Sequence, residues 1–206
     1  MDFVTPGYYY WFLPITMALY FALLKGKQEN RIILLVIMSY IFFFLSSGWY
    51  FILLAVSTCT DWIAGKRISV SDDISVKKRW LYASLSINLG LLAVFKYLDF
   101  FIESLNLITL KLPSSPEIST LGLILPVGIS FYTFQTMSYT FDVYRKKLKP
   151  TRDFISFASF VSFFPQLVAG PIERATHLLP QFYKKRTFEY HKALDGTRQI
   201  LWGLFK

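Results

Sequence analysis

Long stretches without charged residues decide what this chain can fold into. Residues 3–24 contain no Asp, Glu, Lys or Arg over 22 positions, and residues 32–60 contain none over 29. A helix needs about 20 mostly apolar residues to cross the hydrocarbon core of a bilayer. Of the 206 residues, 54% are hydrophobic and 17% are charged, whereas soluble domains contain about 25% charged residues. The sequence therefore predicts an all-α integral membrane protein and excludes an ordinary soluble domain.

The charge-free stretches predict about five transmembrane helices. Residues 32–60 are too long for one crossing and contain a Ser-Ser-Gly turn at 46–48, so we expect two helices joined there. Lys96 ends the fourth predicted helix, and Pro126 and Gly128 interrupt the fifth. The predicted spans are residues 3–24, 32–45, 49–64, 80–95 and 118–141.

The charges of the loops predict the orientation. Short loops rich in Lys and Arg stay in the cytoplasm. Of the four charged loops, 25–31, 65–79 and 142–153 carry a basic excess, and 96–117 has two basic and three acidic residues. This alternation favours an N-terminus on the outer side of the membrane. We therefore interpret the net charge of +9 as a property of cytoplasmic loops and not as a sign of nucleic-acid binding.

Residues 154–172 are expected to enter the membrane without crossing it. Pro165, Gly170 and Pro171 leave an unbroken stretch of only 11 residues, 154–164. The tail from residue 173 carries seven basic and three acidic residues, which would lie on the wrong side after a full crossing. We therefore predict a re-entrant segment followed by a basic amphipathic tail, with an ordinary sixth crossing as the alternative.

Polar residues within the predicted spans are candidate functional groups, because polar groups at membrane depth are costly. Gln135, Ser138 and Asp142 lie on one face of the fifth span. Two interpretations stay open for this face. It either lines a hydrated tunnel, or it forms hydrogen bonds between helices while Asp142 pairs with Arg145.

A second cluster of polar residues lies where the segment at 163–174 breaks. Gln166, Glu173 and Arg174 accompany two prolines and a glycine there. Broken helices at membrane depth tend to line cavities, so these side chains are candidates to face a substrate path. The alternative is a capped turn at the lipid headgroups.

Three other polar residues in or near the spans receive structural interpretations. Asp61 and Lys96 are expected to be interface residues whose side chains snorkel toward the headgroups. Asn88 is expected to form hydrogen bonds between helices.

The residue patterns predict neither a catalytic residue nor a metal site. His177 and His191 lie in the basic tail, and neither has a Ser, Cys or carboxylate partner at a spacing typical of a nucleophile and its base. No paired metal-ligand spacing is present, and Cys59 is the single cysteine. The basic clusters at 145–147 and 184–186 are interpreted as orientation signals, or as groups that attract lipid headgroups or an anionic acyl donor.

Several motifs together resemble one family. The run Leu-Pro-Val-Gly-Ile-Ser-Phe-Tyr-Thr-Phe-Gln at 125–135, continuing to Asp-Val-Tyr-Arg at 142–145, closely resembles the membrane-bound O-acyltransferases in their bacterial alginate O-acetylation branch. Segments 88–97, 163–174 and 198–206 resemble that branch in the same order. The resemblance covers nearly the whole chain.

The resemblance implies a function and a set of site residues. Family members pass an acyl group from a cytoplasmic donor, here acetyl-CoA, through a tunnel in the bacterial inner membrane. The acceptor is a polysaccharide handled at the outer face with a partner similar to SGNH hydrolases. Alternatives are D-alanyl transfer to teichoic acid and a non-enzymatic transporter or scaffold. The residues that match family motifs, and are therefore tunnel candidates, are Gln135, Ser138, Asp142, Arg145, Gln166, Gly170, Pro171, Glu173 and Arg174.

The resemblance also implies that the chain is incomplete. The family's catalytic histidine lies in an apolar segment downstream of the matched part, and neither His177 nor His191 occupies that place. We therefore expect an N-terminal fragment or a truncated reading frame that is inactive alone.

Overall fold

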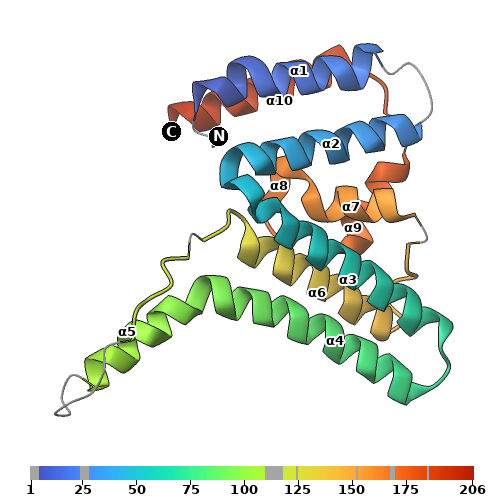
Figure 1. The fold of residues 1–206 in the computed structure, drawn as a ribbon. Helices are drawn as coiled ribbons and strands as arrows, with labels where there is room; N and C mark the ends of the chain where they lie inside the picture. The colour runs from blue at the N-terminus through green and yellow to red at the C-terminus, as the bar shows by residue number, and fades with distance from the viewer. Residues whose placement is uncertain are drawn as a thin grey trace.

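The computed structural model describes residues 5–23, 28–109, 118–123, 125–151, 153–167, 170–184 and 186–206. Every regular element in these ranges is a helix (Figure 1). The N-terminal helix combines π-helical turns at Tyr8–Phe12 and Leu19–Leu23 with α1, Leu13–Ala18. The following helices are α2 (Gln28–Ser47), α3 (Phe51–Val70), α4 (Ile74–Leu92), α5 (Leu98–Thr109), α6 (Ile129–Tyr144), α7 (Phe154–Ser162), α8 (Phe164–Leu167), α9 (Ala175–Tyr183) and α10 (Tyr190–Phe205).

The turn predicted at 46–48 separates α2 from α3. A short 3-10 turn, Gly48–Tyr50, joins the two helices. Gly48 adopts a φ of 59°, a conformation that glycine reaches without the steric cost of a Cβ. The expectation of two helices joined by a tight turn is therefore confirmed.

Within the described residues, two helical runs are long and apolar enough to cross a membrane. The most apolar 18-residue window of Gln28–Val70 has a mean hydropathy of 2.2, and that of Ile74–Ile108 has a mean hydropathy of 1.6. Both runs fit an all-α membrane protein. The number of crossings stays a prediction.

The fourth predicted helix is longer than expected at both ends. It begins at Ile74, where the Asp73 side chain accepts a hydrogen bond from the backbone N–H of Ser75 at 2.8 Å. It does not stop at Lys96, because a π-helical turn, Ala93–Tyr97, carries it into α5. Lysine is a good helix former, and the Lys96 ammonium donates to the Ser130 hydroxyl at 3.3 Å.

The fifth predicted helix is shorter than expected. Residues 118–123 have no helical structure, and α6 begins only at Ile129. Pro126 explains the difference, because proline disfavours helical conformation in the residue before it and has no backbone N–H. The carboxylate of Asp99 accepts the backbone N–H groups of Leu121 at 2.9 Å and Leu123 at 3.1 Å.

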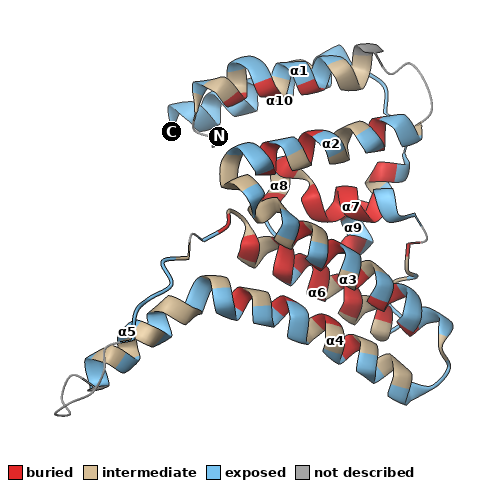
Figure 2. Ribbon diagram, in the orientation of Figure 1, coloured by how far each residue is buried: buried red, intermediate tan, exposed pale blue. Residues whose placement is uncertain are grey.

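Helices α3, α4 and α6 pack against one another, and α7 lies against α2 and α9. Buried positions concentrate on α6 and α7, whereas α10 has none (Figure 2). The segment predicted to be re-entrant forms two short helices, α7 and α8, of nine and four residues. At about 1.5 Å per residue, neither is long enough to cross a bilayer alone. Residues 168–169 lie outside the described ranges, so the re-entrant path stays a prediction.

Candidate functional site

Gln135 links α6 to the end of α7. Its side chain is 2% exposed, and its amide Nε2 donates to the carbonyl of Phe160 at 2.8 Å. Phe160 lies in the last turn of α7, where carbonyl groups lack partners within the helix. Gln135 thus caps α7 and makes the interhelical hydrogen bond that was the alternative to a tunnel role.

Exchanging Gln135 for methionine, which has a similar shape but no donor, should lower the free energy of unfolding by about 1–2 kcal/mol, because the buried Phe160 carbonyl loses its partner. Ser138→Ala is the matched control, since the Ser138 hydroxyl donates only within its own helix, to the Gln135 carbonyl at 2.8 Å. Thermal unfolding of the purified protein in detergent measures both effects. Equal stability of the two variants would contradict the capping role.

The other candidates on α6 lie at its end. The backbone carbonyl of Asp142 accepts the N–H groups of Lys147 at 2.8 Å and Leu148 at 3.2 Å, so the chain turns there. The Arg145 guanidinium lies 5.9 Å from the centroid of the Phe141 ring. Among the described residues, the ion pair between Asp142 and Arg145 that belonged to the alternative interpretation does not form. The tunnel role of these residues stays a prediction.

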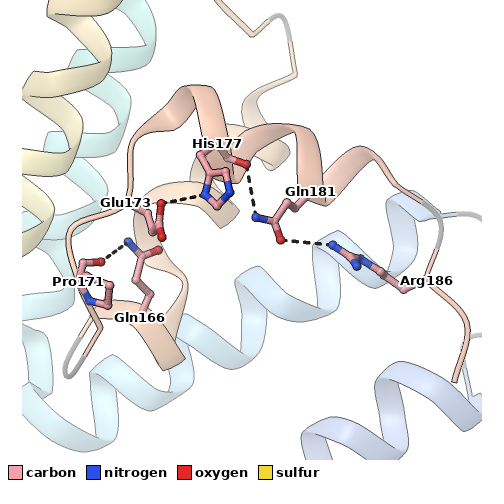
Figure 3. Close-up of polar contacts among 6 residues, drawn as sticks. All are labelled: Gln166, Pro171, Glu173, His177, Gln181 and Arg186. Atoms are coloured by element: carbon pink, nitrogen blue, oxygen red, sulfur yellow. Dashed lines mark hydrogen bonds and ion pairs between the residues drawn. The ribbon is translucent and has the colours of Figure 1, made fainter. Parts of the chain in front are cut away.

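The segment around Gln166 folds back on itself. The N–H of Gly170 donates to the Gln166 carbonyl at 2.7 Å, and the Gln166 amide donates to the Pro171 carbonyl at 3.2 Å (Figure 3). A Cβ on Gly170 would lie 2.8 Å from the Gln166 carbonyl oxygen, so glycine is required there. The Gln166 Oε1 atom is buried and accepts no hydrogen bond from the described residues.

Gly128 brings the two family-like motifs together. It adopts a φ of 74°, which ends the extended segment and begins α6. A Cβ at Gly128 would lie 3.2 Å from the carbonyl oxygen of Leu167 and 3.3 Å from the Leu167 side chain. The start of α6, in the motif at 125–145, therefore packs directly on Leu167, in the motif at 163–174.

Glu173 and His177 form a pair on α9 and its N-terminal approach. The Glu173 carboxylate lies 2.9 Å from His177 Nδ1 (Figure 3). His177 therefore has a carboxylate neighbour that the sequence analysis did not name, and the signal for it was the spacing of four residues across the start of α9. The polar contacts continue along the helix from the His177 carbonyl to Gln181 at 3.4 Å and from Gln181 to Arg186 at 3.3 Å.

Arg174 stands at the start of the same helix. Its carbonyl accepts the N–H groups of His177 and Leu178, both at 3.0 Å. Its side chain is exposed, and no hydrogen bond or ion pair joins its guanidinium to another described residue. Arg174 is therefore free to meet a ligand.

Asp61 is the residue that sequence reasoning misplaced. It is 0% exposed and lies between α3, α4 and α6 rather than snorkelling at an interface. Its carboxylate accepts hydrogen bonds from Asn88 at 2.7 Å, from Thr140 at 2.9 Å and from the Ser84 hydroxyl. No ion pair reaches it within the described ranges.

Asn88 extends this buried polar cluster, which comprises Ser57, Asp61, Ser84, Asn88, Thr136 and Thr140. Its amide oxygen accepts the hydroxyls of Ser57 and, at 3.4 Å, Thr136. The expected interhelical role of Asn88 is therefore confirmed. The sequence signal for the cluster was a set of small hydroxyl residues at helical spacing on the three helices.

A cavity of about 910 Å³ lies at the end of α3 that was predicted to be cytoplasmic. Its lining includes two cationic side chains, Lys66 and Lys149. The hydroxyl-bearing residues Ser69, Thr151 and Tyr183 also line it, and none of its described lining residues is acidic. This arrangement suits an anion that approaches from the side of the membrane predicted to be cytoplasmic.

Two groups of relatives match the whole chain. The chain is 37% identical to an alginate O-acetylase, AlgI, of Pseudomonas putida over 206 residues, which are 100% of this chain and 42% of the relative. AlgI of Pseudomonas aeruginosa is 36% identical over 207 residues, which are 100% of this chain and 39% of that protein. A peptidoglycan O-acetyltransferase of Helicobacter pylori is 33% identical over 233 residues, which are 99% of this chain and 43% of the relative. The chain belongs to the membrane-bound O-acyltransferase family.

No family model and no solved structure matches this chain. The chain spans about two-fifths of the length of the curated relatives given above. His177 lies beside Glu173, and His191 lies beside the ring of Tyr190, with the ring centroids 6.0 Å apart. Both histidines are exposed, so neither lies in the apolar surroundings that the resemblance implies for the catalytic histidine.

Proposed function

We propose that these residues form part of an O-acetyltransferase that moves an acetyl group from a cytoplasmic donor to a polysaccharide hydroxyl outside the inner membrane. The observation that carries this proposal is similarity along the whole chain to relatives named as alginate and peptidoglycan O-acetylating enzymes. The two names share acetyl transfer to a carbohydrate polymer and differ in the polymer. The proposal is therefore confined to that shared chemistry.

Acetyl-CoA is the donor we propose. Its phosphate groups are anionic, and the cavity lined by Lys66 and Lys149 supplies positive charge without an opposing acidic side chain among its described lining residues. An outer-face protein similar to SGNH hydrolases would receive the acetyl group. The basic loops on the same side as the cavity favour its cytoplasmic placement.

Gln166 and Arg174 are the residues for which we propose roles in the transfer. Acyl transfer develops negative charge on the carbonyl oxygen, and donors already held in place stabilise that charge. The turn formed with Gly170 and Pro171 holds the Gln166 side chain. The Arg174 guanidinium carries a permanent positive charge and has no described partner to compete with the substrate.

Arg174→Ala in the full-length protein should lower the rate of acetyl transfer at least tenfold, or about 1.4 kcal/mol in activation free energy. Lys192→Ala is the matched control, because it also removes an exposed cation, one that pairs with Glu189 at 2.8 Å. Acetate released from the polymer by mild alkali measures activity, and immunoblotting measures the amount of protein. Wild-type activity in Arg174→Ala would remove this role.

The function itself is tested in a strain that lacks its own polysaccharide O-acetylase. The full-length protein should restore ester-linked acetate on the polymer, whereas residues 1–206 alone should not. Ester-linked D-alanine instead of acetate would establish the teichoic-acid alternative. No ester of either kind, with the protein present in the membrane, would favour a transporter or scaffold.

A further inference from the structure

A second cavity lies on the other side of α9, between the N-terminal helix, α2 and α8. Its volume is about 280 Å³, close to the lower end of the range of about 300–1,000 Å³ for small-molecule sites. Most of its wall is apolar and comes from all these elements, including Met17, Leu35, Phe163 and Leu178. The space therefore fits one narrow apolar group.

One part of this cavity is cationic. Gln181 and Arg186 line it, and the Arg186 guanidinium donates to the Gln181 side chain at 3.3 Å (Figure 3). Arg31 donates to the backbone carbonyl of Arg186, and its guanidinium lies 5.5 Å from the ring centroid of Tyr20, which also lines the cavity. None of the described lining residues is acidic. The positive charge beside the apolar wall is therefore not neutralised from within the cavity.

We propose that this cavity holds one acyl chain of an anionic phospholipid and that Arg186 binds its phosphate. An apolar wall next to a guanidinium matches the two parts of such a lipid. Arg31 is the last residue of the basic loop predicted to be cytoplasmic, and the cytoplasmic leaflet is the one that presents anionic headgroups. A free phosphate ion gains nothing from the apolar wall, so its binding would leave most of the cavity unexplained.

The proposal is tested by lipid binding to the intact protein, purified in a neutral detergent and stripped of lipid. The probes are dioleoylphosphatidylglycerol, dioleoylphosphatidylcholine and inorganic phosphate, and native mass spectrometry measures occupancy. The wild-type protein should bind the anionic lipid at least tenfold more tightly than the zwitterionic one. Inorganic phosphate at millimolar concentration should not displace it.

Three variants separate the parts of the site. Arg186→Gln should lower affinity for phosphatidylglycerol about tenfold and lower affinity for phosphatidylcholine less, because the choline ammonium already neutralises the phosphate of that lipid in part. Met17→Trp should fill the cavity and abolish binding of both lipids. Lys184→Gln, which removes a charge two residues from Arg186 but outside the cavity lining, should change neither affinity. Leu35→Phe replaces Met17→Trp as the filling variant if thermal unfolding shows that the tryptophan protein is misfolded.

Three outcomes would overturn the proposal. Equal affinity for the two lipids would exclude recognition of the headgroup. Displacement by inorganic phosphate would assign the cation to a free anion. Absence of lipid binding by the folded wild-type protein would mean that another part of the full-length protein fills the cavity.

Discussion

Replacing Asp61 with alanine is expected to lower the free energy of unfolding by about 3 kcal/mol. The change removes the acceptor for three hydrogen bonds, from Ser84, Asn88 and Thr140, and each is worth about 1 kcal/mol. Hydrogen bonds between helices in membranes have similar or slightly smaller values. The measurement is unfolding of the purified protein in detergent by heat or by added dodecyl sulfate.

A reciprocal exchange gives this prediction a specific test. Asp61→Asn places an amide donor against the amide donor of Asn88, so that variant should also be less stable than the wild type. The double variant Asp61→Asn/Asn88→Asp restores one donor and one acceptor and should recover part of the loss. Asp72→Ala, at an exposed carboxylate near the end of α3, is the control and should unfold like the wild type. Full stability of Asp61→Ala would show that the cluster contributes nothing to folding.

Gly128→Ala is expected to lower the free energy of unfolding by about 2–5 kcal/mol and to reduce acetyl transfer with it. A residue with a Cβ in the left-handed conformation costs roughly 1–2 kcal/mol, and overpacking typically adds about 1–3 kcal/mol. The second term applies here because the new methyl group would lie 3.2 Å from the Leu167 carbonyl oxygen. Unfolding curves and the acetate assay together measure the effect.

Gly122 provides the matched control for this prediction. It also has a positive φ, 59°, but a Cβ there would meet nothing within 4 Å. Gly122→Ala should therefore show the conformational cost without the packing cost. If both variants lose the same stability, the contact between the two motifs is not what makes Gly128 necessary.

Local features of the fold were predictable, whereas partners distant in sequence were not. The turn between α2 and α3 follows from a small-residue interruption in an apolar run that is too long for one crossing. Lys96 was expected to end a helix, but the helix continues through it. A single charged residue interrupts the apolar pattern of the sequence and leaves the backbone hydrogen bonds of the helix intact. Asp61 was misplaced because its burial depends on Thr140, which is 79 positions away in the sequence.

The candidate site was predictable only as a set of motifs. The resemblance grouped Gln166, Gly170 and Pro171, and the structure connects them by hydrogen bonds. Periodicity placed Gln135 on a possible tunnel face, yet its partner is a carbonyl at the end of another helix, which no spacing within α6 reveals. The pair of Glu173 and His177 was readable from their spacing of four residues.

Because of the π-helical turn at Ala93–Tyr97, the length of this helix need not equal the length of its membrane crossing. From Arg79 to Lys96 the helix rises about 26 Å at about 1.5 Å per residue. With both basic side chains extended toward the headgroups, this distance matches a hydrocarbon core of roughly 30 Å. The helical axis bends at the turn, and α5 continues in a new direction (Figure 1). We therefore expect α5 to lie beyond the core as an interfacial helix, with Asp99 and the extended segment it holds on the side of the membrane predicted to be outer.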